Sequence, residues 1–430
     1  MNISVKAAER IEGTIEIPGD KSISHRAVML GSISGGVTEA KNFLEGGDCL
    51  STVNAFREMG VDIEVKGKNL RISGPGLKGL SRPQKDLYLG NSGTTMRLIS
   101  GILAGQDFEA RLTGDESLSK RPMERIMAPL RQMGADIASE AGNGSAPLRI
   151  RGRQLRPISY DLPVASAQVK SCILLAGLYA DGKTSVTEPL QSRDHTERML
   201  EYFGARISRS GLTTSVISGS NMPALTGRPI RVPGDISSAA FFMALAALLK
   251  GSRVVMKSVG INPTRRKIID ILKRMGADIS LSTEEKYFEP VCDIRVNGGR
   301  LKGTTVLPGE IPQVIDEIPV LSVCAALAEG KTVIRGIREL RVKETDRVFS
   351  IVDNLARLGA DVRSDNENLY ISGRPGRFAN AQLRSFGDHR TAMSMAVAAC
   401  LSDGTCTIED VDCVNTSFPN FFGLLETVKI

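Results

Sequence analysis

Charged and hydroxyl-bearing residues of this chain gather in short segments, each standing directly before an apolar, alanine-rich stretch. Six segments have this form: GDKSISHR from Gly19, NSGTTMR from Asn91, SAQVKS from Ser166, GDISSAA from Gly234, IDEIPV from Ile315 and GDHRTAM from Gly387. We interpret each as a helix start, where free backbone N–H groups and nearby cations attract anions. Carboxylates at such places can also accept and donate protons. The pattern predicts acid–base chemistry on an anionic ligand.

The first two segments hold residues suited to anion binding. In GDKSISHR, Lys21 and Arg26 supply cations, and Ser22 supplies a hydroxyl group that can cap the helix. In NSGTTMR, Gly93 allows a ligand to approach the backbone closely and Thr94 adds a hydroxyl group. Taken singly, each segment also fits an ordinary capped helix start. The sequence therefore favours binding only when the segments are considered together.

Two later segments supply candidate acid–base groups. Asp316 and Glu317 begin an otherwise apolar helix, where charge is costly unless it is paired or used. A carboxylate there is either a general base or a partner for the helix dipole. In RVKETDR, Glu344 is flanked by Lys343 and by Arg347 one turn later. Such a carboxyl group can exchange a proton while the arginine holds an anion, although a solvated helix start has the same composition.

The remaining polar motifs indicate anion binding rather than metal binding. His389 and Arg390 stand together at the sixth segment, and Arg121 precedes a proline before a helical stretch, where a surface arginine is the alternative. The chain has three histidines, which lack the regular spacing of metal ligands. It contains neither a GxxxxGK[ST] nor a GxGxxG motif. We expect no metal and no organic cofactor.

The spacing of the six segments predicts a repeated supersecondary unit. In the second repeat we expect two helices and three strands: a helix at 91–105, a strand at 108–112, a helix at 123–133 and a strand pair at 135–138 and 148–151. The unit is βαβαββ. In the fourth repeat, residues 239–249 are apolar on every side, which a helix tolerates only when protein surrounds it. The helices should therefore be central and the sheets outside them.

Six repeats are most simply arranged as two α/β domains of three repeats each. We expect one domain at 20–231 and a second, discontinuous one at 1–19 and 232–430. The last repeat ends in a helix near 418–427 without a strand pair, so the first nineteen residues should supply the missing strands. Two crossings between domains make a hinge, and the polar segments would face the cleft between the domains.

Composition limits the kinds of partner. The 430 residues carry a net charge of +7, but there is no run of five basic residues, no tryptophan, and only 4% aromatic residues. This balance suits a phosphorylated small molecule better than a nucleic acid. The seven cysteines are scattered and form no CxxC pair, and no apolar run reaches the ~18 residues of a membrane span. We expect a cytoplasmic protein that binds neither nucleic acid nor membrane.

Nine ordered motifs carry a resemblance to a known family: GDKSISHR, GNSGTTMR, LSKRPM, SAQVKS, RDHTERM, IDEIP, RVKETDR, GDHRTAM and TSFPNF. Together they resemble the 3-phosphoshikimate 1-carboxyvinyltransferases, also called EPSP synthases, from about residue 5 to the C-terminus. The resemblance implies a two-domain inside-out α/β barrel with its active site in the interdomain cleft. It also implies a monomer without cofactor, which transfers the enolpyruvyl group of phosphoenolpyruvate to the 5-hydroxyl of shikimate 3-phosphate in aromatic amino-acid biosynthesis.

The resemblance also implies roles for particular residues. Shikimate 3-phosphate would be bound by Ser22, Arg26, Ser166, Gln168, Arg193 and Lys343, with Lys21 shared between the substrates. Phosphoenolpyruvate would be bound by Gly93, Arg121, Arg347 and Arg390, with Asn91, Thr94 and His389 nearby. Asp316 would take the proton of the attacking hydroxyl, while Glu344 and Lys21 would move the proton of the methylene carbon. Ala167 departs from the family pattern, since many members have a phosphate-binding serine there.

Three alternatives remain at this point. UDP-N-acetylglucosamine 1-carboxyvinyltransferases share the fold and the donor, but characteristically have a loop cysteine that residues 113–123 lack. RNA 3′-phosphate cyclases have related units but need a nucleotide site and a catalytic histidine. A non-catalytic protein that binds a phosphorylated ligand is a third interpretation. The presence of Lys21, Asp316 and Glu344 together argues against it.

Overall fold

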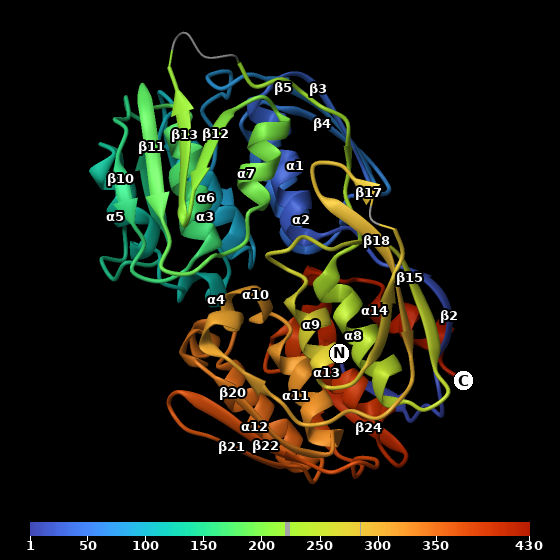
Figure 1. The fold of residues 1–430 in the computed structure, drawn as a ribbon. Helices are drawn as coiled ribbons and strands as arrows, with labels where there is room; N and C mark the ends of the chain where they lie inside the picture. The colour runs from blue at the N-terminus through green and yellow to red at the C-terminus, as the bar shows by residue number, and fades with distance from the viewer. Residues whose placement is uncertain (220–223, 284) are drawn as a thin grey trace. The chain divides into compact units, whose positions relative to one another are not determined.

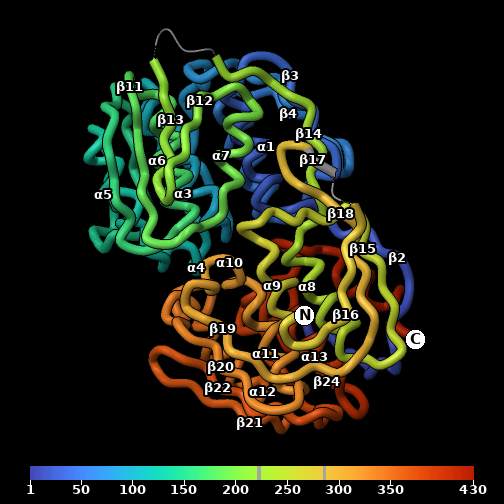
Figure 2. The backbone as a smooth tube through the Cα atoms, viewed as in Figure 1, coloured from blue at the N-terminus to red at the C-terminus, as the bar shows by residue number. Residues whose placement is uncertain are grey.

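The computed structural model describes residues 1–219, 224–283 and 285–430 of the chain (Figures 1 and 2). These residues divide into two compact units. The continuous unit is Gly19–Val232, and the discontinuous unit joins Met1–Pro18 to Pro233–Ile430. The chain therefore passes from one unit to the other at two places in the sequence.

The continuous unit contains three four-stranded sheets, in the strand orders β14-β3-β5-β4, β6-β7-β9-β8 and β10-β11-β13-β12. The strands are β3 (Gly35–Lys41), β4 (Asp62–Lys66), β5 (Asn69–Pro75), β6 (Leu87–Tyr88), β7 (Glu109–Thr113), β8 (Asp136–Ser139), β9 (Leu148–Arg151), β10 (Ser159–Asp161), β11 (Gly182–Thr187), β12 (Arg206–Ser210), β13 (Thr213–Ser218) and β14 (Ile230–Arg231). In each sheet a short edge strand is parallel to its neighbour and the other pairs are antiparallel. This is the arrangement that a βαβαββ repeat produces.

The helices of the continuous unit alternate between a buried and a more amphipathic type. They are α1 (Lys21–Ile33), α2 (Gly47–Glu58), α3 (Gly93–Leu103), α4 (Glu116–Ser119), α5 (Glu124–Gln132), α6 (Ala167–Gly177) and α7 (His195–Tyr202). After their first turns, α1, α3 and α6 are almost completely buried. Helices α3 and α6 pack closely at Gly101 of α3. A Cβ atom there would lie only 2.2 Å from the Cys172 carbonyl oxygen of α6. Helix α6 packs against β11 and β13, as Figure 1 shows.

The discontinuous unit repeats this plan with strands from both ends of the chain. Its strands are β1 (Ile3–Lys6), β2 (Glu12–Glu16), β15 (Arg253–Gly260), β16 (Asp278–Leu281), β17 (Glu285–Lys286), β18 (Pro290–Asn297), β19 (Thr305–Val306), β20 (Gly330–Arg335), β21 (Asp361–Ser364), β22 (Asn368–Gly373), β23 (Gln382–Arg384) and β24 (Thr405–Glu409). Strand β1 is antiparallel to β24, and β2 is parallel to β15. The prediction that the N-terminal residues complete this unit's sheets is therefore confirmed.

Three buried helices again occupy the centre of the discontinuous unit. Its helices are α8 (Ile236–Leu248), α9 (Lys267–Arg274), α10 (Ile311–Val314), α11 (Ile318–Leu327), α12 (Arg347–Arg357), α13 (His389–Cys400) and α14 (Phe421–Val428), with the short 3₁₀ helices η1 (Pro308–Glu310), η2 (Arg338–Val342) and η3 (Val411–Thr416). Every residue of α11 and α13 is buried, as are all but the last of α8. Burial on all sides explains why α8 is apolar all round.

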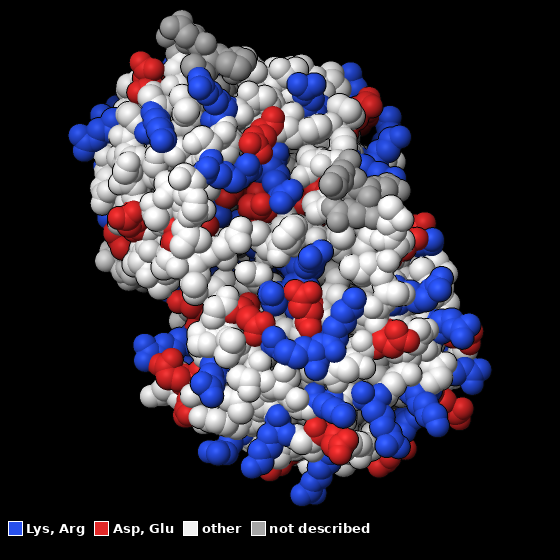
Figure 3. All heavy atoms as spheres, in the orientation of Figure 1, with Lys and Arg blue, Asp and Glu red and all other residues white. Residues whose placement is uncertain are grey.

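The elements expected in the second repeat are present within two residues of the predicted bounds. They are α3, β7, α5, β8 and β9. In both units, acidic and basic side chains are interspersed over the face visible in Figure 3, with no continuous basic stripe. Within the described ranges, no helix is long and apolar enough to cross a membrane.

Candidate active site

The polar segments lie at helix starts, as predicted, and most are fixed there by a capping side chain. Asp20 accepts a hydrogen bond from the Ile23 amide (2.9 Å) at α1, and Ser92 accepts one from the Thr95 amide (3.1 Å) at α3. Ser166 caps α6, Asp235 caps α8 and Asp388 caps α13 in the same manner. A cap places the residues that follow it in the first helical turn. The segments therefore present their side chains beside free backbone N–H groups.

In the continuous unit, Asn91 and Arg121 are in direct contact. The Arg121 guanidinium donates to the Asn91 carbonyl oxygen (3.2 Å), to Asn91 Oδ1 and to Ser117 Oγ (3.2 Å). The Asn91 amide group donates in turn to Asp115 Oδ2 (2.7 Å). A Cβ atom at Gly93 would lie 3.1 Å from Arg121 Nη1, so glycine leaves room for this guanidinium at the start of α3. The structure thus brings three predicted phosphoenolpyruvate-binding residues together.

A second group of candidate residues connects α3 to α6. Gln168 Nε2 donates to Thr94 Oγ1 (3.0 Å), and Arg97 Nη1 donates to Gln168 Oε1 (2.8 Å). Ala167 is the first residue of α6, directly after the cap residue Ser166. These bonds hold the starts of two neighbouring buried helices in fixed register.

The cations of the first segment, Lys21 and Arg26, make hydrogen bonds and ion pairs within the continuous unit. Lys21 Nζ lies 3.1 Å from Asp48 Oδ2, and both side chains are mostly buried. The Arg26 guanidinium donates to Thr196 Oγ1 of α7 (2.6 Å), to Ser171 Oγ of α6 (3.0 Å) and to the Ser22 carbonyl oxygen (2.8 Å). Arg26 therefore connects α1 to α6 and α7, and it is also a candidate substrate-binding residue. Arg193 lies half-buried just before α7.

Beside Arg26, His25 is completely buried and contacts hydroxyl groups from two other helices. His25 Nδ1 lies 2.7 Å from Thr52 Oγ1, Thr52 Oγ1 lies 2.7 Å from Thr95 Oγ1, and Thr95 Oγ1 lies 2.7 Å from Ser92 Oγ. Burial, with a further contribution from Lys21 and Arg26, holds the pKa of His25 well below its ordinary value of 6.5. The imidazole is therefore neutral at pH 7, and it supports the α3 start without adding charge.

In the discontinuous unit, one buried arginine holds three carboxylates. Arg347 donates through Nε to Asp388 Oδ2 (2.8 Å), through Nη1 to Asp316 Oδ1 (3.1 Å) and through Nη2 to Glu344 Oε2 (2.8 Å). We call these four residues the Arg347 cluster. Burial alone would lower the pKa of Arg347, but the carboxylates of Asp388, Glu344 and Asp316 raise it above its ordinary value. The arginine stays charged and holds both candidate acid–base groups close together.

Arg390 and His389 lie beside the Arg347 cluster in the discontinuous unit. Arg390 Nη1 donates to the Asp316 carbonyl oxygen (3.4 Å), and its Nε lies 3.8 Å from Asp316 Oδ1. His389 is the first residue of α13 and is buried, while Lys343 is half-buried beside Glu344. The structure therefore brings Asp316, Glu344, Arg347 and Arg390 into one group.

Sequence reasoning assigned no role to Asp388, and it named Glu317 only beside Asp316, as a general base or a partner for the helix dipole; both carboxylates are buried in the discontinuous unit. Asp388 is fully buried, pairs with Arg347 and accepts hydrogen bonds from the Arg390 and Thr391 amides (2.7 and 3.2 Å). Glu317 is buried beside Ser237, which donates to Glu317 Oε1, and it lies 3.9 Å from Arg390 Nη1. The GD pair before α13 signalled a cap, but the ion pair to a residue 41 positions away left no local signal.

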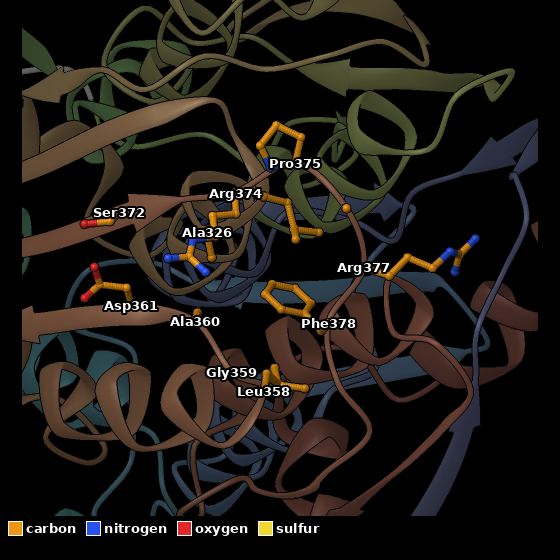
Figure 4. A pocket seen from close by; sticks show the side chains of 12 residues that line it. Ala326, Leu358, Gly359, Ala360, Asp361, Ser372, Arg374, Pro375, Arg377 and Phe378 are labelled. Carbon is orange, nitrogen blue, oxygen red and sulfur yellow. The ribbon is translucent and has the colours of Figure 1, made fainter.

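Within the described ranges, no group of three or more histidine, cysteine, aspartate or glutamate residues could hold a metal ion. The carboxylates of the Arg347 cluster are held by a guanidinium group instead. A pocket of about 470 Å³ lies elsewhere in the discontinuous unit, at the C-terminal ends of α11 and α12, lined partly by Leu327, Leu358 and Phe378 (Figure 4). Since the candidate residues lie at or before the N-terminal ends of these helices, this pocket is separate from them.

The helix-centred α/β repeats place arginines and lysines at helix starts, and a buried arginine holds a pair of carboxylates. These are the groups that an enzyme needs to move protons on anionic substrates. Comparison with known proteins identifies the family. The model of the family EPSP synthase (3-phosphoshikimate 1-carboxyvinyltransferase) matches residues 5–425, and the chain belongs to this family.

Individual relatives agree with this assignment along the whole chain. The chain is 52% identical over 428 residues to a 3-phosphoshikimate 1-carboxyvinyltransferase from Geotalea uraniireducens, covering 99% of both proteins. It is 49% identical over 417 residues to one from Bacillus pumilus, covering 97% of both. A solved structure of EPSP synthase from Acinetobacter baumannii is 47% identical, with a TM-score of 0.89 over 100% of this chain and 98% of that one. The expected fold class is thereby confirmed.

Proposed function

We infer how the candidate residues divide the work of the family's reaction in this chain. As a member of the EPSP synthase family, the chain transfers the enolpyruvyl group of phosphoenolpyruvate to the 5-hydroxyl of shikimate 3-phosphate. The products are 5-enolpyruvylshikimate 3-phosphate and inorganic phosphate, in the shikimate pathway of aromatic amino-acid biosynthesis. The alternative acceptor, UDP-N-acetylglucosamine, is not supported by the family match.

The Arg347 cluster is the observation that carries the proposed acid–base roles. Asp316 and Glu344 are bound to the same guanidinium group, and their side chains are 14% and 21% exposed. Asp316 takes the proton of the 5-hydroxyl as its oxygen bonds to C2 of phosphoenolpyruvate. The methylene carbon gains a proton in the same addition, from Glu344 or Lys21.

Elimination reverses the proton movement at carbon. The bond between C2 and the phosphate oxygen breaks, the methyl carbon of the adduct loses a proton to the group that delivered it, and phosphate leaves. The developing positive charge near C2 is stabilised by the carboxylates, while the leaving phosphate is stabilised by cations. The alternation of Arg347 and Arg390 with Asp316 and Glu344 supports this assignment.

We assign the phosphoenolpyruvate anion to Gly93, Arg121, Arg347 and Arg390, with Asn91 and His389 adjacent. Two observations support this. Arg121 is fixed at the start of α3 by Asn91, beside the only side-chain-free position of that turn, Gly93. Arg347 uses one N–H group each for Asp388, Asp316 and Glu344, and a guanidinium group has five, so donors remain for a substrate oxygen.

We assign shikimate 3-phosphate to Ser22, Arg26, Ser166, Gln168 and Arg193 of the continuous unit and to Lys343, with Lys21 shared between the substrates. The hydrogen bonds of Arg26 to α6 and α7 support its place in this group, because Ser166 caps α6 and Arg193 lies two residues before the start of α7. Thr94 bonds to Gln168 and orders it. Ala167 offers only its backbone N–H group at the start of α6.

We propose that the enzyme acts as a monomer in the cytoplasm. The seven cysteines are free thiols, six of them buried, which suits a reducing compartment.

A phosphate-release assay tests the reaction. Purified chain mixed with phosphoenolpyruvate and shikimate 3-phosphate should release inorganic phosphate at the same rate with and without a metal chelator. Replacement of shikimate 3-phosphate by UDP-N-acetylglucosamine should abolish release. Release with the nucleotide sugar and none with shikimate 3-phosphate would overturn the assignment.

A further inference from the structure

A buried lysine on α6 forms a second charged cluster, in the continuous unit. Lys170 follows the cap residue Ser166 by one helical turn, and its residue surface is 1% exposed. Its Nζ lies 2.6 Å from Glu188 Oε2 and 2.7 Å from Glu197 Oε1. Ser192 donates a hydrogen bond to the other oxygen of Glu188. We call these four residues the Lys170 cluster.

The Lys170 cluster is costly to bury and therefore needs an explanation other than stability. Burial alone would lower the pKa of Lys170, but Glu197 and Glu188 raise it above its ordinary value, so the ammonium group is charged. Burial raises the pKa of Glu197, although Lys170 partly offsets this effect. Well-packed apolar residues of similar volume often stabilise a fold as well as a buried ion pair or better. The cluster is thus better explained by the positions it fixes.

Each carboxylate of the cluster is attached to a segment that carries a proposed phosphate ligand. Glu188 follows β11 and bonds to Ser192, which directly precedes Arg193. Glu197 lies in the first turn of α7, next to Thr196. Lys170, on α6, joins these two segments through its ion pairs. The loop bearing Arg193 is therefore tied to α6 at both of its ends.

The neighbours of the cluster extend the same connection to Arg26. Thr196 Oγ1 accepts from Arg26 Nε (2.6 Å) and lies 2.6 Å from Ser171 Oγ, the residue after Lys170. Ser171 Oγ also accepts from Arg26 Nη2 (3.0 Å). The relative positions of Arg26, Arg193 and Ser166 thus depend on one contact region between α1, α6 and α7.

We propose that Lys170 is a positioning residue for shikimate 3-phosphate, which sets the spacing of Arg26, Arg193 and the α6 start through its ion pairs with Glu188 and Glu197. This inference rests on the proposed role of those three groups as ligands of shikimate 3-phosphate. Without the ammonium group, two buried carboxylates would face each other. Their repulsion would displace the loop that carries Arg193 and the first turn of α7.

The Asn91–Arg121 contact, by contrast, includes no member of the Lys170 cluster. Phosphoenolpyruvate binding should therefore be little affected. We expect Lys170→Met in the full chain to raise the KM for shikimate 3-phosphate at least tenfold, with the KM for phosphoenolpyruvate changed less than twofold. A role in stability alone would move neither KM selectively.

A second pair of variants decides the matter if Lys170→Met does not fold. Glu188→Ala removes the hydrogen bond from Ser192 but leaves the ion pair of Lys170 with Glu197, so that no buried charge is unbalanced. This variant should raise the KM for shikimate 3-phosphate at least fivefold. Glu188→Gln keeps an oxygen for Lys170 and a hydrogen-bonding group for Ser192, so the KM should return to within twofold of the parent value. Leu174→Ala, also fully buried on α6, is the control: it should lower the melting temperature without separating the two KM values.

Arg193→Gln tests the proposed ligand set of shikimate 3-phosphate separately from the positioning role of Lys170. If it leaves the KM for shikimate 3-phosphate unchanged, the proposed ligand set is wrong. If it raises that KM while the Lys170 and Glu188 variants raise neither KM, or raise both equally, the ligand set stands and the positioning role of Lys170 is overturned.

Discussion

Two buried cations, each surrounded by carboxylates, occur in the two units and differ in how far they reach solvent. In the Arg347 cluster, Asp316 and Glu344 are 14% and 21% exposed. In the Lys170 cluster, Glu188 and Glu197 are 4% and 1% exposed. A carboxylate must contact the substrate to exchange a proton with it. A fully buried carboxylate can only hold the segments of the chain to which it belongs in place. The exposure of Asp316 and Glu344 therefore allows the Arg347 cluster to take part in proton transfer, whereas the buried Glu188 and Glu197 can only position neighbouring segments.

The largest expected effect comes from removing the exposed base. Asp316→Asn keeps an oxygen that can accept from Arg347 but cannot take the hydroxyl proton. Turnover should fall roughly 10²- to 10⁴-fold, while both substrates still bind. Steady-state kinetics with equilibrium binding would measure this. Near-normal turnover would remove Asp316 from the role of base and erase the contrast between the clusters.

Asp388, the fully buried carboxylate of the Arg347 cluster, should contribute to the stability of the fold. Asp388 is fully buried, so Asp388→Ala leaves the buried Arg347 without its Nε partner. Breaking a buried pair in this way should lower the free energy of unfolding by about 3–5 kcal/mol. Asp353→Ala, which breaks an ion pair with Arg357 near the surface, should cost only about 0.5 kcal/mol. Equal losses in denaturant titrations would contradict the account.

Gly93→Ala tests the proposed binding of phosphoenolpyruvate at the start of α3. The added methyl carbon would lie 2.8 Å from Arg97 Nη1 and 3.1 Å from Arg121 Nη1, so both guanidinium groups must shift. The KM for phosphoenolpyruvate should rise on the order of tenfold, which corresponds to about 1.4 kcal/mol, with a smaller change for shikimate 3-phosphate. Gly299→Ala, where a Cβ atom would meet open space, is the matched control and should change neither value.

The smallest effect concerns His25, a fully buried side chain that carries no charge at pH 7. Because the pKa of His25 is held below 6.5 in the folded state, the unfolded chain binds more protons as the pH falls below that value. This histidine should therefore lower the free energy of unfolding by up to about 1.4 kcal/mol per pH unit below pH 6.5, and have no such effect above it. Urea titrations at pH 5.5 and 7.5 should show that His25→Gln lacks this part of the pH dependence. Identical pH dependence in both proteins would contradict it.

The sequence predicted local features well, since these follow from periodicity and capping. The all-apolar stretch at α8, the second repeat and the N-terminal strands formed as expected. Glu344 and Arg347, three positions apart, form the ion pair that their spacing indicated, although Glu344 lies before the cap residue Asp346 and outside α12. Such contacts depend on residues close together in the chain.

Contacts between distant segments left no comparable signal. Lys170 stands in SAQVKS like any polar residue at a helix start, and only the fold shows that Glu188 and Glu197 enclose it. The pairing of Arg347 with Asp388, and that of Arg26 with Thr196, likewise depend on how helices pack. Packing sets these contacts, and a helical or strand period does not encode which helices meet.

The most direct test measures kcat and both KM values for Asp316→Asn and Lys170→Met in parallel. We expect Asp316→Asn to lower kcat at least a hundredfold with little change in either KM, whereas Lys170→Met should chiefly raise the KM for shikimate 3-phosphate. A Lys170 variant that loses turnover with both KM values unchanged, or an Asp316 variant that loses only affinity, would contradict it.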